Sequence, residues 1–420
     1  MRFVHTADLH LGRRLAQMPL EEDLAHVLGQ LADVVREEGA DALVVAGDVF
    51  DSPNPSEAAL RQWDGFLRLM AGRGVHTLVV SGNHDSGARL AYGATFAADK
   101  DVYIAGELTG EVVHVEVGGA TFWLVPFVRP ADVRAWAQRL GLDPSPVVSY
   151  DTALRLVLDH VRGLPEFSRG PNVCVAHQFV TCGGASPVRS DSERLSLGTL
   201  DNVDSSAFDG FDYVALGHMH RPQRVGRDAC RYAGSPLKLS SSEIAQSKSF
   251  AVVDVGAPVV APAPHGKHFA AAPAPEPASE GAAGEGAAPA GGVSVRLVPV
   301  RPLHDFRAER GSLAELVARA QGEPEAERLD YVRAIVTDDS ALDVVARLRH
   351  VWPNLEQVTF DNSITRAAGA TTPDAEVTGR SMQELFSQFF SEQAGREPSE
   401  GEAALVREAF ERVMGEGERA

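Results

Sequence analysis

Five short polar motifs in the first 220 residues carry the kinds of side chain that hold divalent metal ions. In chain order they are Asp8-Leu9-His10, Gly47-Asp48, Gly82-Asn83-His84-Asp85, His177 and Gly217-His218-Met219-His220. Carboxylate, imidazole and amide groups are metal ligands, and the bound ions activate water for hydrolysis. Each motif alone is a weak signal, because Asn and Asp favour turns and a single histidine is usually structural. Together the motifs predict a metal-dependent hydrolytic site.

A predicted β-strand precedes each motif. Apolar segments predict these strands at residues 2–7, 42–46, 75–80, 173–176 and 213–216. Side chains that follow strand ends can meet at one edge of a layered sheet. Residues two apart in a strand project to the same side, so Asp8 with His10, and His218 with His220, would each point two ligands into one cavity. Asp48 could then bridge two ions about 3.5–4 Å apart, the separation used for in-line displacement at phosphorus.

The rest of the pattern predicts an α/β chain in four parts. Residues 1–256 form the first, with helices at 22–38 and 152–161, a helix capped by Ser56, and β segments at 112–117 and 121–125. Residues 257–292 are rich in Ala, Pro, Gly and Glu, which predicts a disordered insert at the tip of a hairpin with arms at 250–255 and 293–300. Residues 293–362 predict a small α/β domain. Residues 363–420 predict a linker and two amphipathic helices, at 381–392 and 399–414.

Composition and charge narrow the class of protein. The 420 residues are 44% hydrophobic, enough for a large core, yet no run approaches the roughly 20 apolar residues of a membrane span. The start lacks a secretory signal, and a removable leader would take Asp8 with it, so we expect a cytoplasmic protein. Cys174, Cys182 and Cys230 fit neither a disulfide framework nor a zinc site. The net charge of -19 has the wrong sign for gripping DNA over a broad surface, so metal ions or a partner must compensate.

The order of the five motifs resembles that of the calcineurin-like metallophosphoesterase superfamily. More narrowly, the segments 5–12, 46–51 and 232–237 resemble SbcD-type bacterial nucleases, which work with an SbcC-type ATPase. The resemblance is dense over residues 1–255 and looser over 293–362, where that family carries a capping domain. It is faint in Glu384-Leu385-Phe386 and the final helix. The implied fold is a layered α/β/β/α metallophosphoesterase sandwich with a small α/β capping domain and C-terminal helices.

The resemblance also implies roles for individual residues. One metal ion would be held by Asp8, His10, Asp48 and His220, and a second by Asp48, Asn83, His177 and His218. His84 matches the family's catalytic histidine, which contacts the scissile phosphate. Asp51 stands where archaeal relatives have a second histidine, and two roles stay open for it: orienting His84, or capping a helix or loop. Oxygen and imidazole ligands without a thiolate favour manganese, with magnesium as the substitute, and the ligand types leave zinc and iron open as well.

The implied function is a metal-dependent DNA nuclease that hydrolyses phosphodiester bonds with two metal ions. It would act as a 3'-5' exonuclease on duplex ends and as an endonuclease on single-stranded or hairpin DNA, within an SbcC–SbcD-like complex of DNA repair and recombination. Its partners would be DNA and an SbcC-like ATPase, with no membrane, and a homodimer stays open. Candidate contacts to DNA phosphates are Arg13, Arg14, Arg89, Arg189, Arg194 and Arg221. The C-terminal helices would dock on the ATPase, unless they pack on the small domain.

Two other functions compete with this one. A small-molecule phosphodiesterase of the same superfamily would have the same metal site, but it would need neither the small domain nor the apolar C-terminal helices. A non-catalytic scaffold could keep the fold, but a decayed site should have lost ligands, and every expected ligand position here holds a competent residue. Activity on cyclic nucleotides above that on DNA favours the first alternative, and failure to bind two equivalents of manganese favours the second.

Overall fold

The structure is a computed structural model that describes residues 1–191, 193, 202–256, 292–339, 342–363 and 365, with 390, 391, 396, 398, 399, 401 and 402 near the C-terminus. The expected insert, apart from Gly292, and most of both expected C-terminal helices therefore lie outside the described residues. The chain divides into two compact units. One comprises Met1–Val336 with Ala341–Thr359, and the other comprises Thr337–Ser340 with Phe360–Ala420. The fold described below is that of the first unit.

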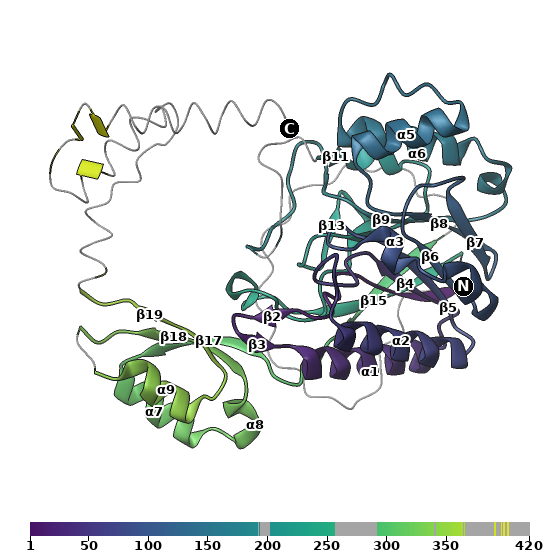
Figure 1. The fold of residues 1–420 in the computed structure, drawn as a ribbon. Coiled ribbons are helices and arrows are strands. Elements are labelled where there is room, and N and C mark those ends of the chain that lie inside the picture. Colours follow the sequence, from purple (N-terminus) through teal and green to yellow (C-terminus); the bar gives the residue numbers. More distant parts are fainter. Residues whose placement is uncertain are drawn as a thin grey trace. The chain divides into compact units, whose positions relative to one another are not determined.

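The first sheet has six strands and contains the strands that lead into the first three motifs. Its order is β16 (Val293–Pro299), β15 (Ser249–Val255), β1 (Arg2–Thr6), β4 (Ala42–Ala46), β5 (His76–Val80) and β6 (Val102–Ala105). Strands β1, β4, β5 and β6 run parallel, whereas β15 and β16 are antiparallel to their neighbours. Figure 1 labels β4, β5, β6 and β15 of this sheet. The pairing of β15 with β16 confirms the predicted hairpin. It also means that residues 293–299 extend this first sheet, although we expected them to begin the small domain.

The second sheet also has six strands and leads into the last two motifs. Its order is β13 (Gln223–Val225), β14 (Arg227–Tyr232), β12 (Tyr213–Gly217), β9 (Asn172–His177), β8 (Ala120–Val125) and β7 (Val113–Val117). The four central strands are parallel, and β13 and β7 are antiparallel edge strands. Strands β4, β5, β8 and β9 are apolar and buried along almost their whole length, as expected of strands that are covered on both faces.

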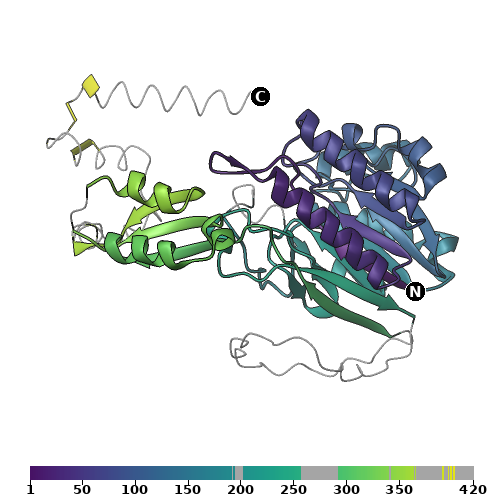
Figure 2. The same cartoon turned by 90° about the horizontal axis from the view of Figure 1, so that it is seen from below.

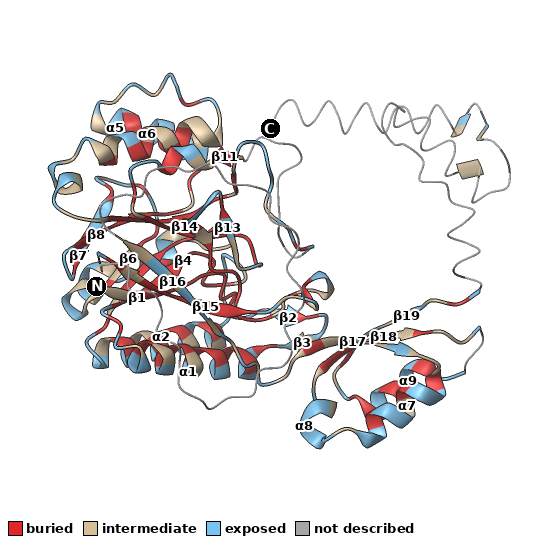
Figure 3. Ribbon diagram, turned by 180° about the vertical axis from the view of Figure 1, so that it is seen from behind, coloured by how far each residue is buried: buried red, intermediate tan, exposed pale blue. Residues whose placement is uncertain are grey.

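The two sheets pack face to face around a shared apolar core. At its centre the ring of Phe3 lies edge-to-face against Phe122 and Tyr213, with centroid separations of 5.2 and 5.5 Å. The outer face of the first sheet is covered by α1 (Glu21–Glu37) and α2 (Glu57–Gly72), and that of the second by α5 (Pro130–Leu140) and α6 (Tyr150–Arg162). Helix α1 is purple in Figure 2, and Figure 3 shows buried strands between exposed outer helix faces. The α/β/β/α layering is therefore confirmed.

A small domain follows β16 in the chain. Its three-stranded sheet has the order β17 (Phe306–Gly311), β18 (Tyr331–Val336) and β19 (Leu355–Phe360), with β17 and β18 parallel. Helices α7 (Leu313–Gly322) and α9 (Val344–Val351) pack on it through Leu316, Leu348 and Trp352, and α8 (Glu325–Arg328) is a single turn. The side chains of His304 and Tyr331 reach the first domain, where both contact the Asp23 carboxylate.

The remaining elements are short. They are β2 (Arg14–Leu15), β3 (Met18–Pro19), α3 (Gly87–Leu90), α4 (Ala94–Ala97), β10 (Val180–Thr181) and β11 (Val203–Asp204), with 3-10 turns at Ala98–Lys100, Pro165–Ser168, Ser205–Phe208 and Ser241–Glu243. The predicted cap of α2 is confirmed, since the Ser56 side chain accepts a hydrogen bond from the Ala59 amide. Cys174, Cys182 and Cys230 are free thiols. Of the helices that the structure describes, none is both long and apolar enough to span a bilayer.

The core between the sheets predicts a large cost for truncating a buried leucine. Leu124 on β8 has no solvent exposure, so Leu124→Ala should lower the free energy of unfolding by about 2–5 kcal/mol, through lost burial and the cavity left behind. The matched control is Leu342→Ala, because Leu342 is 86% exposed and its truncation should change stability by no more than about 0.5 kcal/mol. Urea unfolding followed by circular dichroism measures both, and equal effects would contradict the assigned core.

Candidate metal centre

The five motifs meet at the carboxyl ends of the parallel strands of both sheets. Asp8, Asp48 and Asn83 follow β1, β4 and β5 in the first sheet, while His177 ends β9 and His218 follows β12 in the second. The sheets pack closely there: a Cβ added at Gly217 would lie 1.8 Å from the Ala46 carbonyl oxygen. Glycine at that position is therefore a requirement of the approach between the sheets.

The local backbone differs from the one that we expected. Asp8, His10 and Asp48 adopt left-handed conformations with φ of 53°, 48° and 49°, and His218 has φ of 108°. Asp8 and His10 thus lie beyond the end of β1, and His218 and His220 lie beyond the end of β12. Strand alternation therefore does not direct either pair to one side, and that prediction was wrong. The convergence of these side chains results from sharp turns at the strand ends. Such conformations are costly for residues with a Cβ, and they are concentrated at functional sites.

The predicted ligand side chains are all brought into one cluster. The Nε2 atoms of His10 and His220 are 3.1 Å apart, and Asp48 Oδ2 lies 3.7 Å from His10 Nε2 and 3.4 Å from His177 Nε2. The Asn83 amide oxygen is 3.0 Å from His177 Nε2 and 2.8 Å from His218 Nδ1. Three overlapping groups have ligand atoms within 4.8 Å of one another: Asp8, His10 and His220; Asp8, Asp48 and His177; and His10, Asp48 and His84. Asp8, His10 and Asp48 each belong to two of them.

Main-chain contacts fix the orientation of these side chains. His177 Nδ1 lies 2.8 Å from the Ala46 carbonyl, to which it donates as the protonated nitrogen, so Nε2 faces Asp48 and Asn83. The Asp8 carboxylate accepts the His218 amide at 3.0 Å, and Asp48 Oδ1 accepts the His84 amide at 2.8 Å. Each carboxylate therefore ties its own loop to a neighbouring loop of the site.

Burial and the neighbouring charges together set the protonation of the cluster. Burial raises the pKa of Asp8 to about 7, because the charged carboxylate loses its water. Burial acts in the same direction on Asp48, but the neighbouring His177 and His10 outweigh it and hold the pKa of Asp48 below its usual range. Burial lowers the pKa of His218 to about 3 and that of His220 to about 4. Both histidines are therefore neutral near pH 7, which is the form that binds metals.

The donor set fits divalent cations. His218 Nε2 is buried without a hydrogen-bond partner, which is costly unless an ion uses its lone pair. His220 Nδ1 lies 3.2 Å from Glu243 Oε1 and donates to it, so the Nε2 atom that faces His10 carries a lone pair. Carboxylates, an amide oxygen and neutral imidazole nitrogens are ligands of divalent metals. The cluster can thus hold divalent metal ions, whereas the division of ligands between two ions stays a prediction.

Asp51 contacts His84 through its main chain. Its carbonyl oxygen is 3.0 Å from His84 Nδ1, so that nitrogen donates and Nε2 is left to face the site. The Asp51 carboxylate instead accepts from Arg13 at 3.0 Å and lies 3.3 Å from His10 Nδ1. If Asp51 orients His84, it does so through its backbone carbonyl. Its side-chain carboxylate contacts His10 instead.

Two supporting residues lacked a role in the sequence analysis. Asp85 accepts the amides of Gly82, Val49 and Phe50 at 2.9, 3.1 and 2.9 Å, and so joins the third motif to the second. Because Asp85 ends the Gly-Asn-His-Asp motif, the sequence could have indicated that it belongs to the site. Glu243 lies behind His220 and has no solvent exposure. Nothing in the Ser-Ser-Glu segment around it distinguishes it from a surface residue.

The candidate phosphate contacts are placed differently from one another. Arg13 is half-buried and occupied by Asp51. Arg14 and Arg89 are exposed, and they donate to Gln17 and to the loop at Pro53 and Asn54. Arg189 and Arg221 are also exposed. Arg194 lies outside the described residues. For the exposed arginines, contact with DNA phosphates stays a proposal.

Comparisons with known proteins agree with the resemblance drawn from the motifs. The family model described as calcineurin-like phosphoesterase matches residues 1–222, and that described as type 5 capsule protein repressor C-terminal domain matches residues 301–394. The chain is 32% identical over 257 residues to the SbcD component of the nuclease SbcCD of Staphylococcus epidermidis, and 31% identical over 257 residues to that of Staphylococcus saprophyticus. Each match covers 61% of this chain and 66% of the relative, slightly under two thirds of its length. A solved dimetal phosphatase from Danio rerio is 17% identical, with a TM-score of 0.38 over 60% of this chain and 92% of that chain, a likeness too low to support an argument.

The shared position of Asp48 predicts that its loss impairs the whole cluster. Asp48→Ala should weaken Mn²⁺ binding for both equivalents by at least about tenfold, because its carboxylate lies 3.7 Å from a ring nitrogen of His10 and 3.4 Å from one of His177. Asp64→Asn, at an exposed carboxylate of α2, is the matched control. It should keep both equivalents, because the Asp64 carboxylate pairs with Arg68 at 3.0 Å on the outer helix. Isothermal titration with Mn²⁺ measures both variants, and one fully retained equivalent in Asp48→Ala would contradict the bridging position.

Proposed function

This chain belongs to the calcineurin-like phosphoesterase family, and from that premise we propose that it is a metal-dependent DNA nuclease of the SbcD type. The observation that carries the proposal is the cluster in which Asp48 lies between His10 and His177. The Asn83 amide oxygen lies 3.0 Å from His177 Nε2 and 2.8 Å from His218 Nδ1. We assign Asp8, His10, Asp48 and His220 to one ion, and Asp48, Asn83, His177 and His218 to the other. Manganese is the proposed metal, with magnesium as the substitute.

The residues of the chain would bind and orient a phosphodiester. When bound, divalent ions supply positive charge to the phosphate and lower the pKa of water. His84 is held by the Asp51 carbonyl so that Nε2 faces the cluster, and its ring centroid lies 4.9 Å from that of His10. Burial lowers the pKa of His84, so its imidazole is neutral near pH 7 and Nε2 can accept or share a proton at the scissile phosphate. His84 is thus the proposed catalytic residue.

DNA is the proposed substrate because the relatives are components of a nuclease and the capping-domain region matches a second family model. With a net charge of -19, the chain must obtain much of its phosphate contact from bound ions and from a partner. We propose an SbcC-like ATPase as that partner, in line with the names of the relatives. Cleavage would be 3'-5' exonucleolytic on duplex ends and endonucleolytic on single-stranded or hairpin DNA.

Three further assignments stay predictions. The buried free thiols of Cys174 and Cys230 accord with a reducing cytoplasm. A homodimer would use exposed apolar side chains, and Tyr92 and Phe96, at 91% and 81% exposure, are the candidates nearest in sequence to the third motif. The domain division at residues 1–256, 257–292, 293–362 and 363–420 is kept, apart from the strand at 293–299 that pairs in the first sheet.

End-labelled duplex and single-stranded DNA test the proposal directly. The purified chain, with and without its cognate ATPase, is incubated with Mn²⁺, with Mg²⁺ or with EDTA, and the products are resolved on denaturing gels. We expect Mn²⁺-dependent cleavage that ATP stimulates in the complex. Cleavage of a cyclic nucleotide, with no cleavage of DNA under any of these conditions, would contradict the proposal and favour a small-molecule phosphodiesterase.

Replacing His84 should separate chemistry from metal binding. His84→Ala is expected to lower the turnover of DNA about a hundredfold or more, since proton transfer by a positioned histidine contributes about 10²–10⁴-fold. It should keep both equivalents of Mn²⁺. His350→Ala, at an exposed histidine of the small domain, is the control and should leave turnover unchanged. Loss of a metal equivalent in His84→Ala would make His84 a ligand, as its place in the group with His10 and Asp48 permits.

Residues 380–420 should be needed to bind the ATPase partner and not for hydrolysis. Deleting residues 380–420 is expected to leave Mn²⁺ binding and hydrolysis of a small phosphodiester within about twofold of the full chain, because the proposed ligands all lie between residues 8 and 220. Co-purification with the ATPase and ATP-stimulated duplex cleavage should be lost. An undiminished complex of the truncated chain on gel filtration would refute the docking role.

A further inference from the structure

A buried ion pair lies directly behind the proposed metal ligand His220. Glu243, in the 3-10 turn Ser241–Glu243, has no solvent exposure, and Lys248 is 7% exposed. Lys248 Nζ is 2.6 Å from Glu243 Oε2. We propose that Glu243 and Lys248 are positioning residues that hold His220 in the tautomer and orientation required to bind a metal ion. The inference rests on the proposed function only in treating His220 as a metal ligand.

Glu243 and Lys248 contact His220 at two points. Glu243 Oε1 lies 3.2 Å from His220 Nδ1, and Lys248 Nζ donates to the His220 carbonyl at 2.8 Å. The first contact keeps the proton on Nδ1 and leaves the lone pair on Nε2, which faces His10 Nε2 at 3.1 Å. The second fixes the main chain of the same residue. Glu243 thus fixes the orientation of the His220 ring, and Lys248 fixes the backbone of the same residue.

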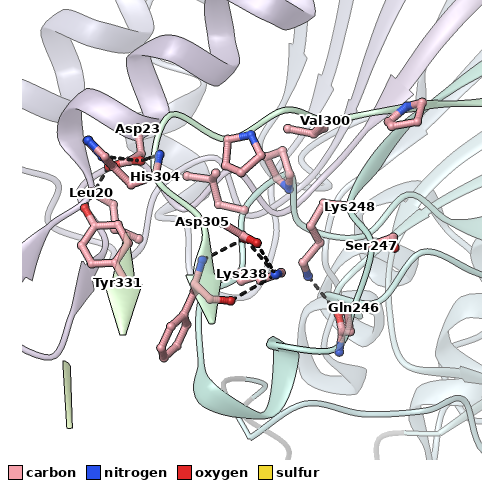
Figure 4. Close-up of a pocket in the computed structure, with 15 residues that line it drawn as sticks. Leu20, Asp23, Lys238, Gln246, Ser247, Lys248, Val300, His304, Asp305 and Tyr331 are labelled. Carbon is pink, nitrogen blue, oxygen red and sulfur yellow. Dashed lines mark hydrogen bonds and ion pairs between the residues drawn. The ribbon is translucent and has the colours of Figure 1, made fainter. Parts of the chain in front are cut away.

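All the N–H donors of the Lys248 ammonium group are used in contacts within the chain. Four acceptors surround its ammonium group, which has three N–H bonds: the His220 carbonyl at 2.8 Å, Ser235 Oγ at 2.9 Å, Glu243 Oε2 at 2.6 Å and Gln246 Oε1 at 3.0 Å. Figure 4 shows the contact with Gln246. Glu243 in turn accepts from the Leu239 amide at 3.3 Å. Lys248 is therefore saturated by the chain itself, which argues against a role as a phosphate contact or a nucleophile.

Stability alone gives little reason for such a pair. Removing two charges from water costs several kcal/mol per ion, and replacing a buried ion pair by apolar residues of similar volume is often neutral or stabilising. A carboxylate behind a metal-bound imidazole, in contrast, contributes about 10–100-fold in metal affinity or activity. The position of the pair, in contact with a ligand and not elsewhere in the core, therefore favours a positioning role.

The same loop offers a matched control. Lys248 lines a cavity of about 270 Å³ together with Lys238, which pairs with Asp305 of the small domain at 2.8 Å (Figure 4). Lys238 also donates to the Phe306 carbonyl at 3.1 Å. Both lysines lie in the segment between β14 and β15, and each forms an ion pair. Of the two, Lys248 contacts His220, whereas Lys238 contacts Asp305 and Phe306. Removing the Lys238–Asp305 pair thus perturbs the loop without touching the ligand.

The test compares two charge-neutral double variants by isothermal titration with Mn²⁺, without DNA. We expect Glu243→Leu/Lys248→Met to weaken one of the two Mn²⁺ equivalents by about 10–100-fold and to leave the other unchanged. Glu243→Gln alone, which keeps an acceptor for His220 Nδ1, should give a smaller loss at the same equivalent. Lys238→Met/Asp305→Leu should bind both equivalents like the unmodified chain.

Thermal unfolding in EDTA shows which variants fold. Equal Mn²⁺ affinity in all folded variants, or the same loss in the Lys238–Asp305 control, would overturn the proposal. If neither Glu243 variant folds, the pair is structural and the proposal is likewise overturned. Absence of Mn²⁺ binding by the unmodified chain would instead contradict the proposed function, so the two failures are distinguishable.

Discussion

Two carboxylates, those of Asp8 and Asp48, lie buried within one cluster where two sheets meet, at 0% and 2% exposure. Burial of ionisable acids in a medium of low dielectric constant costs several kcal/mol unless opposite charge or hydrogen-bond donors compensate. The surrounding structure supplies both. Main-chain amides of His84 and His218 donate to the two carboxylates, and the rings of His10 and His177 border Asp48. Divalent cations would complete the neutralisation, which is why the cluster is suited to hold them.

The geometry of the sheets follows from the same constraint. Ligands from two separate sheets can meet only if the sheets approach closely at the edge where the strands end, and Gly217 against the Ala46 carbonyl is the point of that approach. The left-handed backbone at Asp8, His10 and Asp48 turns the chain back over the strand ends. Further out, Asp85, Glu243 and Lys248 hold the loops that carry these residues. The fold thus places rigid strands beneath a ring of sharply turned loops.

Much of this was predictable from the sequence, because apolar strands and the polar motifs after them are local patterns. The sequence directly predicts the strand at Ala42–Ala46, the Gly-Asp motif that follows it, and the hairpin of β15 and β16. The backbone at Asp8 and His10 was not, because alternation assumes a strand that has already ended at Thr6. The contact of the Asp51 carbonyl with His84, and of Glu243 with His220 across 23 residues, depend on tertiary packing that no spacing encodes. The strand β17 was missed because its residues, with Arg307, Glu309 and Arg310, are largely polar.

We propose that the Asp48 carboxylate lies between two metal ions in this cluster. Anomalous diffraction at the manganese absorption edge, from a crystal of the chain grown with Mn²⁺, would locate the ions. Two anomalous peaks about 3.5–4 Å apart are expected, with the Asp48 carboxylate within bonding distance of both. A single peak, or two peaks of which Asp48 contacts only one, would contradict this proposal.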